Sequence, residues 1–122
     1  MFAPPPSFTN ITLRTTNTEV MEDFYFQLGM LFNKWTSQGE REFFTYSNNY
    51  FEFCLIEVVK EDEVTRNLEF TLVIDEIDGY LEDIKNFNLE IITQPWNKNN
   101  FRYMTFRDPD GHIVNLKSKN YS

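Results

Sequence analysis

The sequence predicts a single α+β domain built from two copies of a strand–helix–three-strand unit, and three observations support this prediction. The chain has 122 residues, which is the length of one ordinary domain. Short runs with a two-residue apolar repeat, typical of half-buried strands, flank two segments whose apolar residues recur at helical spacing. The same order of elements then occurs twice, and a unit of this kind buries its sheet only against its twin. We therefore expect one domain over residues 1–122.

Module one is expected over about residues 8–59. A proline-rich lead-in is followed by an alternating strand over 8–15. Thr16 and Glu19 then have the spacing of a capping box at a helix start, and the helical pattern continues to Gly29, a residue that commonly ends helices. Three β-prone runs follow, at 31–36, 42–46 and 50–59.

Module two is expected over about residues 68–118, after a polar linker over about 60–67. An alternating strand over 68–74 leads to a second helical pattern, which stops at Asn88. Strands follow near 89–94, 101–107 and 112–117. Matching positions of the two opening strands lie 59 residues apart: Ile11 with Phe70, Leu13 with Leu72, and Thr15 with Ile74. The order of elements, more than residue identity, indicates an internal duplication.

The bulk properties of the chain exclude several classes of partner. The net charge of −8 repels phosphate backbones, so we expect no nucleic-acid partner. No window approaches the roughly 18 apolar residues that a membrane span requires. The segment Met1–Pro6 lacks the features of a signal peptide, and the one cysteine, Cys54, forms no internal disulfide. We expect a cytoplasmic protein with no membrane partner, in which Cys54 is an inert thiol within an apolar strand.

Three stretches of the sequence resemble one known superfamily. The segments "FTLVIDEIDGYLEDIKNFNLEIITQP" and "YMTFRDPDGHIVNL" are similar to the second module of vicinal-oxygen-chelate proteins, the group of glyoxalases, bleomycin-resistance proteins and extradiol dioxygenases. The segment "ITLRTTNTEVMEDFYFQLGMLF" resembles the opening of their first module, and the match extends over Phe8–Lys117. The Asp-Pro-Asp-Gly hairpin is the most specific single piece. The resemblance implies two βαβββ modules whose curled mixed sheets surround a central cavity, and homodimers that in some cases exchange modules. It does not fix the chemistry.

The resemblance also implies where a metal would be held. Metal-dependent members place His, Gln or Glu ligands on the first and last strands of each module. The matching positions here are Asn10, Glu69, Asn115 and either Glu52 or Glu57. None is histidine, and neutral amide oxygens are poor ligands for Zn, Fe, Mn or Ni. We therefore expect no metal cofactor, and a divalent metal is disfavoured. The single histidine, His112, is three residues before Asn115 and should therefore point to the opposite face of the strand. It is interpreted as a polar hairpin residue.

Because the metal-ligand positions lack suitable side chains, the cavity itself becomes the candidate site. The aromatic share of 17% is high for a small core and indicates that some rings line a pocket or an interface. Polar residues of the two opening strands alternate with the apolar ones and are expected to point inward. The residues expected to bind the ligand are Asn10, Thr12, Arg14, Trp35, Phe44, Glu69, Thr71, Trp96, Tyr103 and Asn115.

Two functions fit this interpretation. The first is a metal-independent protein that binds or sequesters a small organic molecule, cationic or aromatic, with Glu69 as the charge partner. The alternative is a divergent lyase, isomerase or dioxygenase that uses Glu69 as a general base or holds a metal in an unusual site. The sequence identifies neither the ligand nor whether turnover occurs.

Overall fold

The computed structural model describes residues 3–36, 42–48 and 51–119. The start of the expected strand at residue 50 and the first two residues of the lead-in lie outside these ranges. Module one consists of β1 (Asn10–Thr15), α1 (Thr18–Gln27), β2 (Asn33–Thr36), β3 (Glu42–Ser47) and β4 (Glu52–Glu57). Module two consists of β5 (Glu69–Val73), α2 (Leu81–Asn86), β6 (Ile91–Lys98), β7 (Phe101–Arg107) and β8 (Ile113–Lys119). Short 3-10 turns occupy the linker at η1 (Glu61–Glu63) and precede α2 at η2 (Asp78–Tyr80). The predicted order β-α-β-β-β, repeated once, is confirmed.

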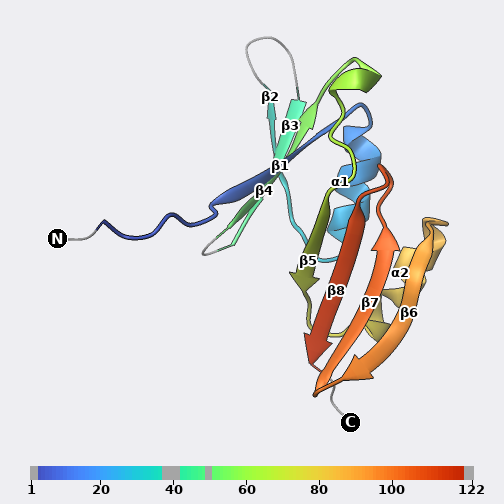
Figure 1. The fold of residues 1–122 in the computed structure, drawn as a ribbon. Helices are drawn as coiled ribbons and strands as arrows, with labels where there is room; N and C mark the ends of the chain where they lie inside the picture. Colours follow the sequence, from blue (N-terminus) through green and yellow to red (C-terminus); the bar gives the residue numbers. More distant parts are fainter. Residues whose placement is uncertain (1–2, 37–41, 49–50, 120–122) are drawn as a thin grey trace.

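The two modules have the same sheet topology (Figure 1). Within the described ranges, the strands form a four-stranded sheet of order β1-β4-β3-β2, here called sheet A, and a four-stranded sheet of order β5-β8-β7-β6, here called sheet B. The first strand of each module pairs in parallel with the last, and the remaining neighbours are antiparallel. Both sheets are therefore mixed, as the resemblance implies.

The start of α1 differs from the prediction. Asn17 is the N-cap, and no side chain caps the helix there. Thr16 does not form the expected capping box with Glu19, because its hydroxyl donates to Glu61 in the linker at 2.9 Å. The backbone N–H of Asn17 is bound instead by the hydroxyl of Thr15, at 3.0 Å. The Thr16 contact therefore ties module one to the linker.

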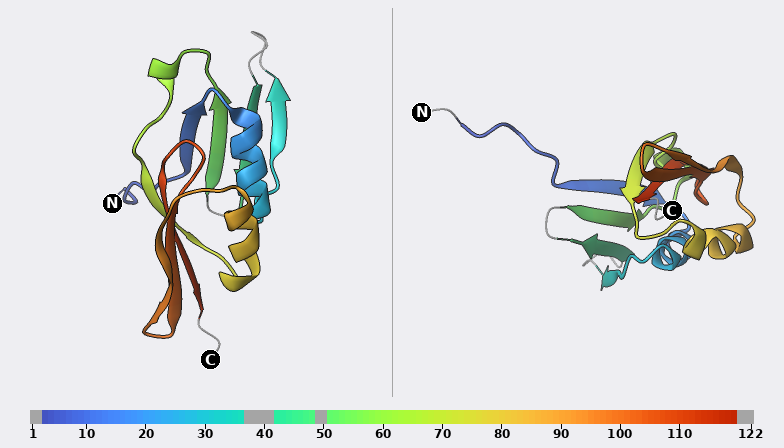
Figure 2. Two further views of the ribbon diagram at one scale, coloured as in Figure 1. Left: turned by 90° about the vertical axis from the view of Figure 1, so that its right-hand side faces the viewer. Right: turned by 90° about the horizontal axis from the view of Figure 1, so that it is seen from below.

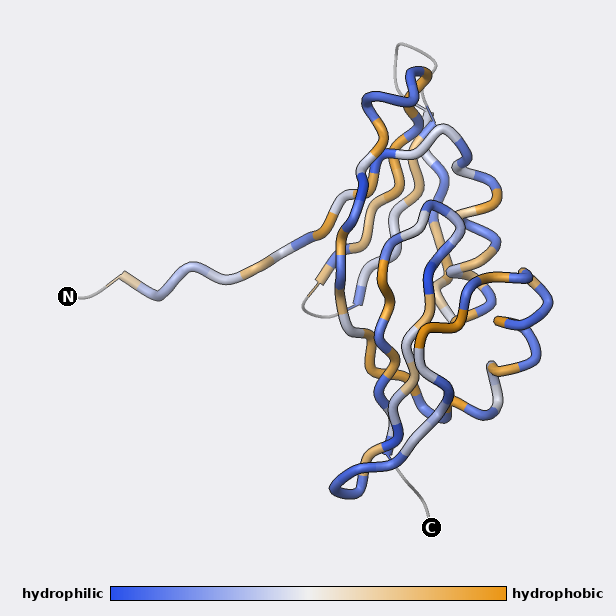
Figure 3. Tube along the Cα trace, turned by 45° about the vertical axis from the view of Figure 1, so that its right-hand side comes forward, coloured by the Kyte–Doolittle hydropathy of each residue, from blue (hydrophilic) through white to orange (hydrophobic). Residues whose placement is uncertain are grey.

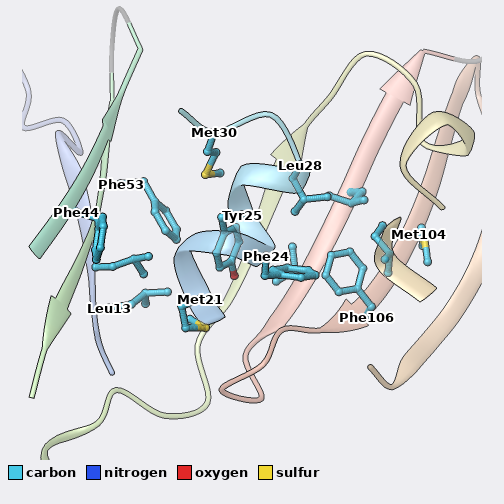
Figure 4. Packing of buried hydrophobic residues seen from close by; sticks show 14 of the residues in the cluster. Leu13, Met21, Phe24, Tyr25, Leu28, Met30, Phe44, Phe53, Met104 and Phe106 are labelled. Atoms are coloured by element: carbon cyan, nitrogen blue, oxygen red, sulfur yellow. The ribbon is translucent and has the colours of Figure 1, made fainter. Parts of the chain in front are cut away.

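The core is centred on α1, which packs against both sheets (Figure 4). Phe24 contacts Phe106 of sheet B with ring centroids 5.5 Å apart, and Tyr25 contacts Phe53 of sheet A at 4.9 Å. Both helices thus lie in the angle between the sheets (Figure 2). No helix within the described ranges is long and apolar enough to cross a membrane.

The opposite face of each sheet, which carries no helix, is here called its open face. Because the helices fill the angle between the sheets, the two open faces point away from each other within one chain (Figure 2). Side chains that were expected to line one cavity therefore lie on two separate surfaces. The lead-in over 3–9 also projects away from the rest of the chain (Figure 3).

Candidate ligand-binding surfaces

The open face of sheet A carries the polar residues of β1. Leu13 is fully buried against the helices, so by alternation Asn10, Thr12 and Arg14 point to the open side. In the parallel register Asn10 lies beside Glu52 and Thr12 beside Cys54. The Cys54 thiol donates to the Glu52 carboxylate at 3.2 Å, which shows that these two β4 residues share this face.

The sequence did not determine whether Glu52 or Glu57 faces the site, and the strand register decides between them. Glu57 pairs with Thr15, which is fully buried on the helix side of β1. Glu52 pairs with Asn10 and receives a hydrogen bond from the Ser47 hydroxyl at 3.2 Å. Glu52, and not Glu57, therefore lies beside Asn10 on the open face.

The aromatic residues of sheet A divide between its two faces. Trp35 stacks on Phe43 with ring centroids 6.2 Å apart and planes inclined by 13°, and its indole N–H donates to Thr45 at 2.9 Å. These residues lie on the open face. Phe44 does not join them: it is only 7% exposed and pairs with Leu55 on the helix side. Phe44 was expected in the ligand site, but it belongs to the core because consecutive residues of a strand point to opposite faces.

The open face of sheet B holds an ordered polar network. The side-chain N–H of Asn115 donates to Glu69 at 3.1 Å, and the Thr105 hydroxyl donates to the Asn115 carbonyl oxygen at 2.7 Å. Both polar atoms of the Asn115 amide are thus engaged, which fixes the orientation of the amide. Glu69 is exposed at the start of β5, so the network holds an accessible carboxylate in a defined position.

An aromatic cluster continues along the same face. Trp96 contacts Tyr103 with ring centroids 5.2 Å apart, and Tyr103 contacts Phe101 at 6.5 Å. The ammonium of Lys117 lies 4.2 Å from the centre of the Phe101 ring. Trp96 is 44% exposed although it lies within a strand, so its ring is available to a second molecule.

These residues do not fit a divalent metal. The Asn115 carbonyl oxygen already accepts the Thr105 hydroxyl, and its amide nitrogen donates to Glu69. Cys54, and not Glu52 or Glu57 as the sequence suggested, occupies the position of module one that corresponds to Asn115. Each of the two pairs with the threonine that lies two residues after the start of the opening strand. Burial, reinforced by the neighbouring Glu52 carboxylate, raises the pKa of the Cys54 thiol to about 11, which keeps it protonated and a poor ligand. Nowhere in the described ranges do three or more His, Cys, Asp or Glu residues form a group that could hold a metal ion.

The structure also contains a pocket of about 450 Å³ at the junction of the two modules. Its walls are mostly apolar and come from β1, β3, β4, β5 and the segment that follows α1. They include Ile11, Leu28, Met30, Phe53, Phe70 and Leu72. Of the residues predicted to bind the ligand, Thr71 is the one that lines this pocket. Sequence patterns did not identify the pocket, because it depends on how the two modules pack against each other.

His112 lies on the helix side and is fully buried. Its Nδ1 atom accepts the backbone N–H of Leu68 at 3.2 Å, so it supports the start of module two. It makes no part of either open face. Sequence reasoning did not identify its neighbour Asp108 as a buried carboxylate, although the Asp-Pro-Asp-Gly motif draws attention to this turn.

Comparison with known proteins supports the fold. No protein-family model matches the sequence, and no curated protein matches it. Similar solved structures include TioX from Micromonospora sp. ML1, at 12% identity over 93% of this chain and 99% of that one, with a TM-score of 0.70. TnmS3, an antibiotic binding protein from Streptomyces sp. CB03234, is 16% identical over 97% of this chain and 99% of that one, with a TM-score of 0.67. A glyoxalase/bleomycin resistance protein/dioxygenase from Nocardioides is 17% identical over 99% of this chain and 88% of that one, with a TM-score of 0.65. The chain therefore has the vicinal-oxygen-chelate fold, as the sequence predicted.

Proposed function

We propose that this protein binds a small, flat organic molecule on its open faces and does so without a metal ion. The observation that carries the proposal is on sheet B, where exposed Trp96 and half-buried Tyr103 lie on the same face as Glu69. Glu69 accepts a hydrogen bond from Asn115, whose amide is oriented by Thr105. Glu69 and Asn115 are positions where metal-dependent relatives of this fold would hold an ion. An apolar wall with a few oriented polar groups is the usual composition of a small-molecule site.

The aromatic residues supply the flat part of the site. Trp35 is 50% exposed and Trp96 is 44% exposed, one on each open face. Large rings that remain exposed on a sheet face bury area at low entropic cost when a planar ligand stacks on them. Their placement on both sheets favours a ligand with two accessible aromatic faces.

Glu69 supplies the charge. Its carboxylate accepts one hydrogen bond from Asn115 and remains exposed, so it is free to accept others from a ligand. The net charge of −8 draws cations toward the protein at long range. A cationic aromatic molecule would combine ion pairing with Glu69 and cation–π contact with Trp96.

A homodimer would complete the site. The two open faces of one chain point away from each other, so a single chain encloses no ligand between them (Figure 2). We propose that sheet A of one copy faces sheet B of a second copy, with Trp35 and Trp96 on opposite walls. TnmS3, the antibiotic binding protein with the same fold, supports binding of a small molecule in general.

A thermal-shift titration tests the proposal. The protein is purified without metal-affinity chromatography. Proflavine, a flat cationic dye, is then added in the presence and in the absence of EDTA. We expect the same rise in melting temperature in both conditions, because a ligand at 100 times its Kd stabilises the folded state by about 2.7 kcal/mol. Trp96→Ala should reduce the rise. Phe26→Ala, which removes a 47% exposed ring from α1, is the matched control and should not. Binding that disappears with EDTA, or no binding at all, would refute the proposal.

A further inference from the structure

We infer that the ligand carries an acidic group in addition to its aromatic rings, and that Lys117 recognises this group. The inference rests on the proposed function and specifies the class of ligand: an amphoteric flat aromatic compound. It is carried by the position of Lys117 within the open face of sheet B.

Lys117 lies among the residues of the proposed site. Its neighbours in β8, Leu116 and Ser118, are buried on the helix side, so Lys117 points to the open face. It pairs with Tyr103 across the antiparallel ladder and with Val73 across the parallel one. Its ammonium is therefore beside the aromatic cluster that the proposed ligand would contact.

The ammonium has an aromatic partner, and this contact leaves its charge intact. The chain has 19 acidic and 11 basic residues, so carboxylates are plentiful. Arg102 and Arg107 of the adjacent strand each form an ion pair, with Asp78 and Glu90. None of the ion pairs found in the described ranges includes Lys117, whose Nζ lies over the Phe101 ring at 4.2 Å. The ring orients the ammonium but does not neutralise it, so the charge remains available to an anion.

Glu69 and Lys117 are separated along the open face of sheet B. Glu69 aligns with Ile113 at the start of β8, whereas Lys117 is four residues farther along the same strand. Four residues of a strand span about 13 Å. Trp96 and Tyr103 lie on the Lys117 side of this span, since Tyr103 pairs with Lys117. A ligand with a donor or cationic end at Glu69 and an acidic end at Lys117 would match this order of charges.

Three fluorescent probes that differ in charge test the inference: 1-pyrenebutyric acid, its methyl ester and 1-pyrenemethylamine. Their fluorescence anisotropy is titrated with the wild type and with Lys117→Met, Lys117→Arg and Lys85→Met. Lys117→Met keeps an unbranched apolar side chain and removes the charge. Lys85 is an exposed lysine of α2, on the helix side, and its variant is the control.

We expect Lys117→Met to weaken binding of the acid about tenfold and to leave the ester unchanged, because only the acid loses a charged partner. Lys117→Arg should retain tight binding of the acid, and Lys85→Met should behave as the wild type. If the probes bind but the acid-to-ester affinity ratio is the same in Lys117→Met as in the wild type, the inference fails and the proposed function stands. If no probe binds the wild type, both fail. Unchanged ester binding in Lys117→Met also shows that this variant is folded.

Discussion

The hydroxyl of Tyr25 donates a hydrogen bond of 2.6 Å to the carboxylate of Asp108. Tyr25 belongs to α1 of module one and is fully buried, whereas Asp108 lies in the turn between β7 and β8 and is 2% exposed. The other carboxylate oxygen of Asp108 accepts the backbone N–H groups of Asp110 and His112, at 3.0 and 2.9 Å. This contact therefore joins the two modules through a buried carboxyl group.

Removing the Tyr25 hydroxyl should destabilise the protein. Tyr25→Phe keeps the ring contacts with Phe24 and Phe53 but leaves a buried oxygen of Asp108 without its donor. We expect the free energy of unfolding, measured by urea denaturation, to fall by about 1–3 kcal/mol. Tyr103→Phe removes a hydroxyl from the open face of sheet B and is the control. An equal loss in both variants would contradict a special role for the buried contact.

The pH dependence of stability should also report on Asp108. Burial is the largest influence on this carboxyl and raises its pKa above the ordinary value, partly offset by the hydrogen bond from Tyr25. The folded protein therefore holds the proton more tightly than the unfolded chain does. Between the pKa of the unfolded chain and that of the folded protein, the unfolded chain has lost this proton and the folded protein keeps it. The free energy of unfolding therefore falls as the pH rises through this range.

Asp108→Asn checks this sign. The amide cannot ionise, so its stability should decrease less than that of the wild type as pH rises from about 4 through the raised pKa. Urea denaturation at a series of pH values measures the difference between the two curves. Parallel curves would show that Asp108 does not titrate differently in the folded and unfolded states.

The sequence predicted the parts of the fold that depend on local periodicity. Clear alternation assigned both opening strands, and the buried side of β1 is the one that contains Leu13, as expected. The same alternation could not assign strand faces where two apolar residues are adjacent. Phe43 and Phe44 are chemically identical neighbours, so periodicity could not determine which one faces the core. The choice is made by the register with β4, which is a contact between different strands.

Two further features depend on tertiary context. β6 continues to Lys98, beyond its expected end at 94, because an edge strand accommodates Pro95 and register shifts. The orientation of the open faces depends on Phe24, which packs against Phe106 of the other module. No pattern within one module encodes that angle, so the single cavity expected from the sequence is divided between two surfaces in one chain.

Paired substitutions of the adjacent phenylalanines test the assignment of strand faces. Phe44→Ala should lower the free energy of unfolding by about 3–5 kcal/mol, because Phe44 is 7% exposed in the core. Phe43→Ala should cost about 1 kcal/mol, since it mainly loses its stacking on Trp35. Urea denaturation measures both. The reverse order would mean that β3 presents the opposite face to the helices.

The reactivity of Cys54 tests the environment of the open face of sheet A. Burial and the Glu52 carboxylate raise the pKa of the thiol to about 11, so at pH 8 very little thiolate is present. An unperturbed cysteine has a pKa of about 8.5, so the thiolate fraction of Cys54 is lower by roughly two orders of magnitude. We expect Cys54 to react with Ellman's reagent at least two orders of magnitude more slowly in the folded protein than in the unfolded one. The unfolded protein is measured in about 6 M guanidinium, which unfolds even stable domains. Glu52→Gln should speed the reaction modestly, because it removes the second cause of the raised pKa and leaves burial in place. Rapid reaction of the folded wild type would show that the thiol is accessible and ionised, and Cys54 would then have to be considered as a reactive group of the site.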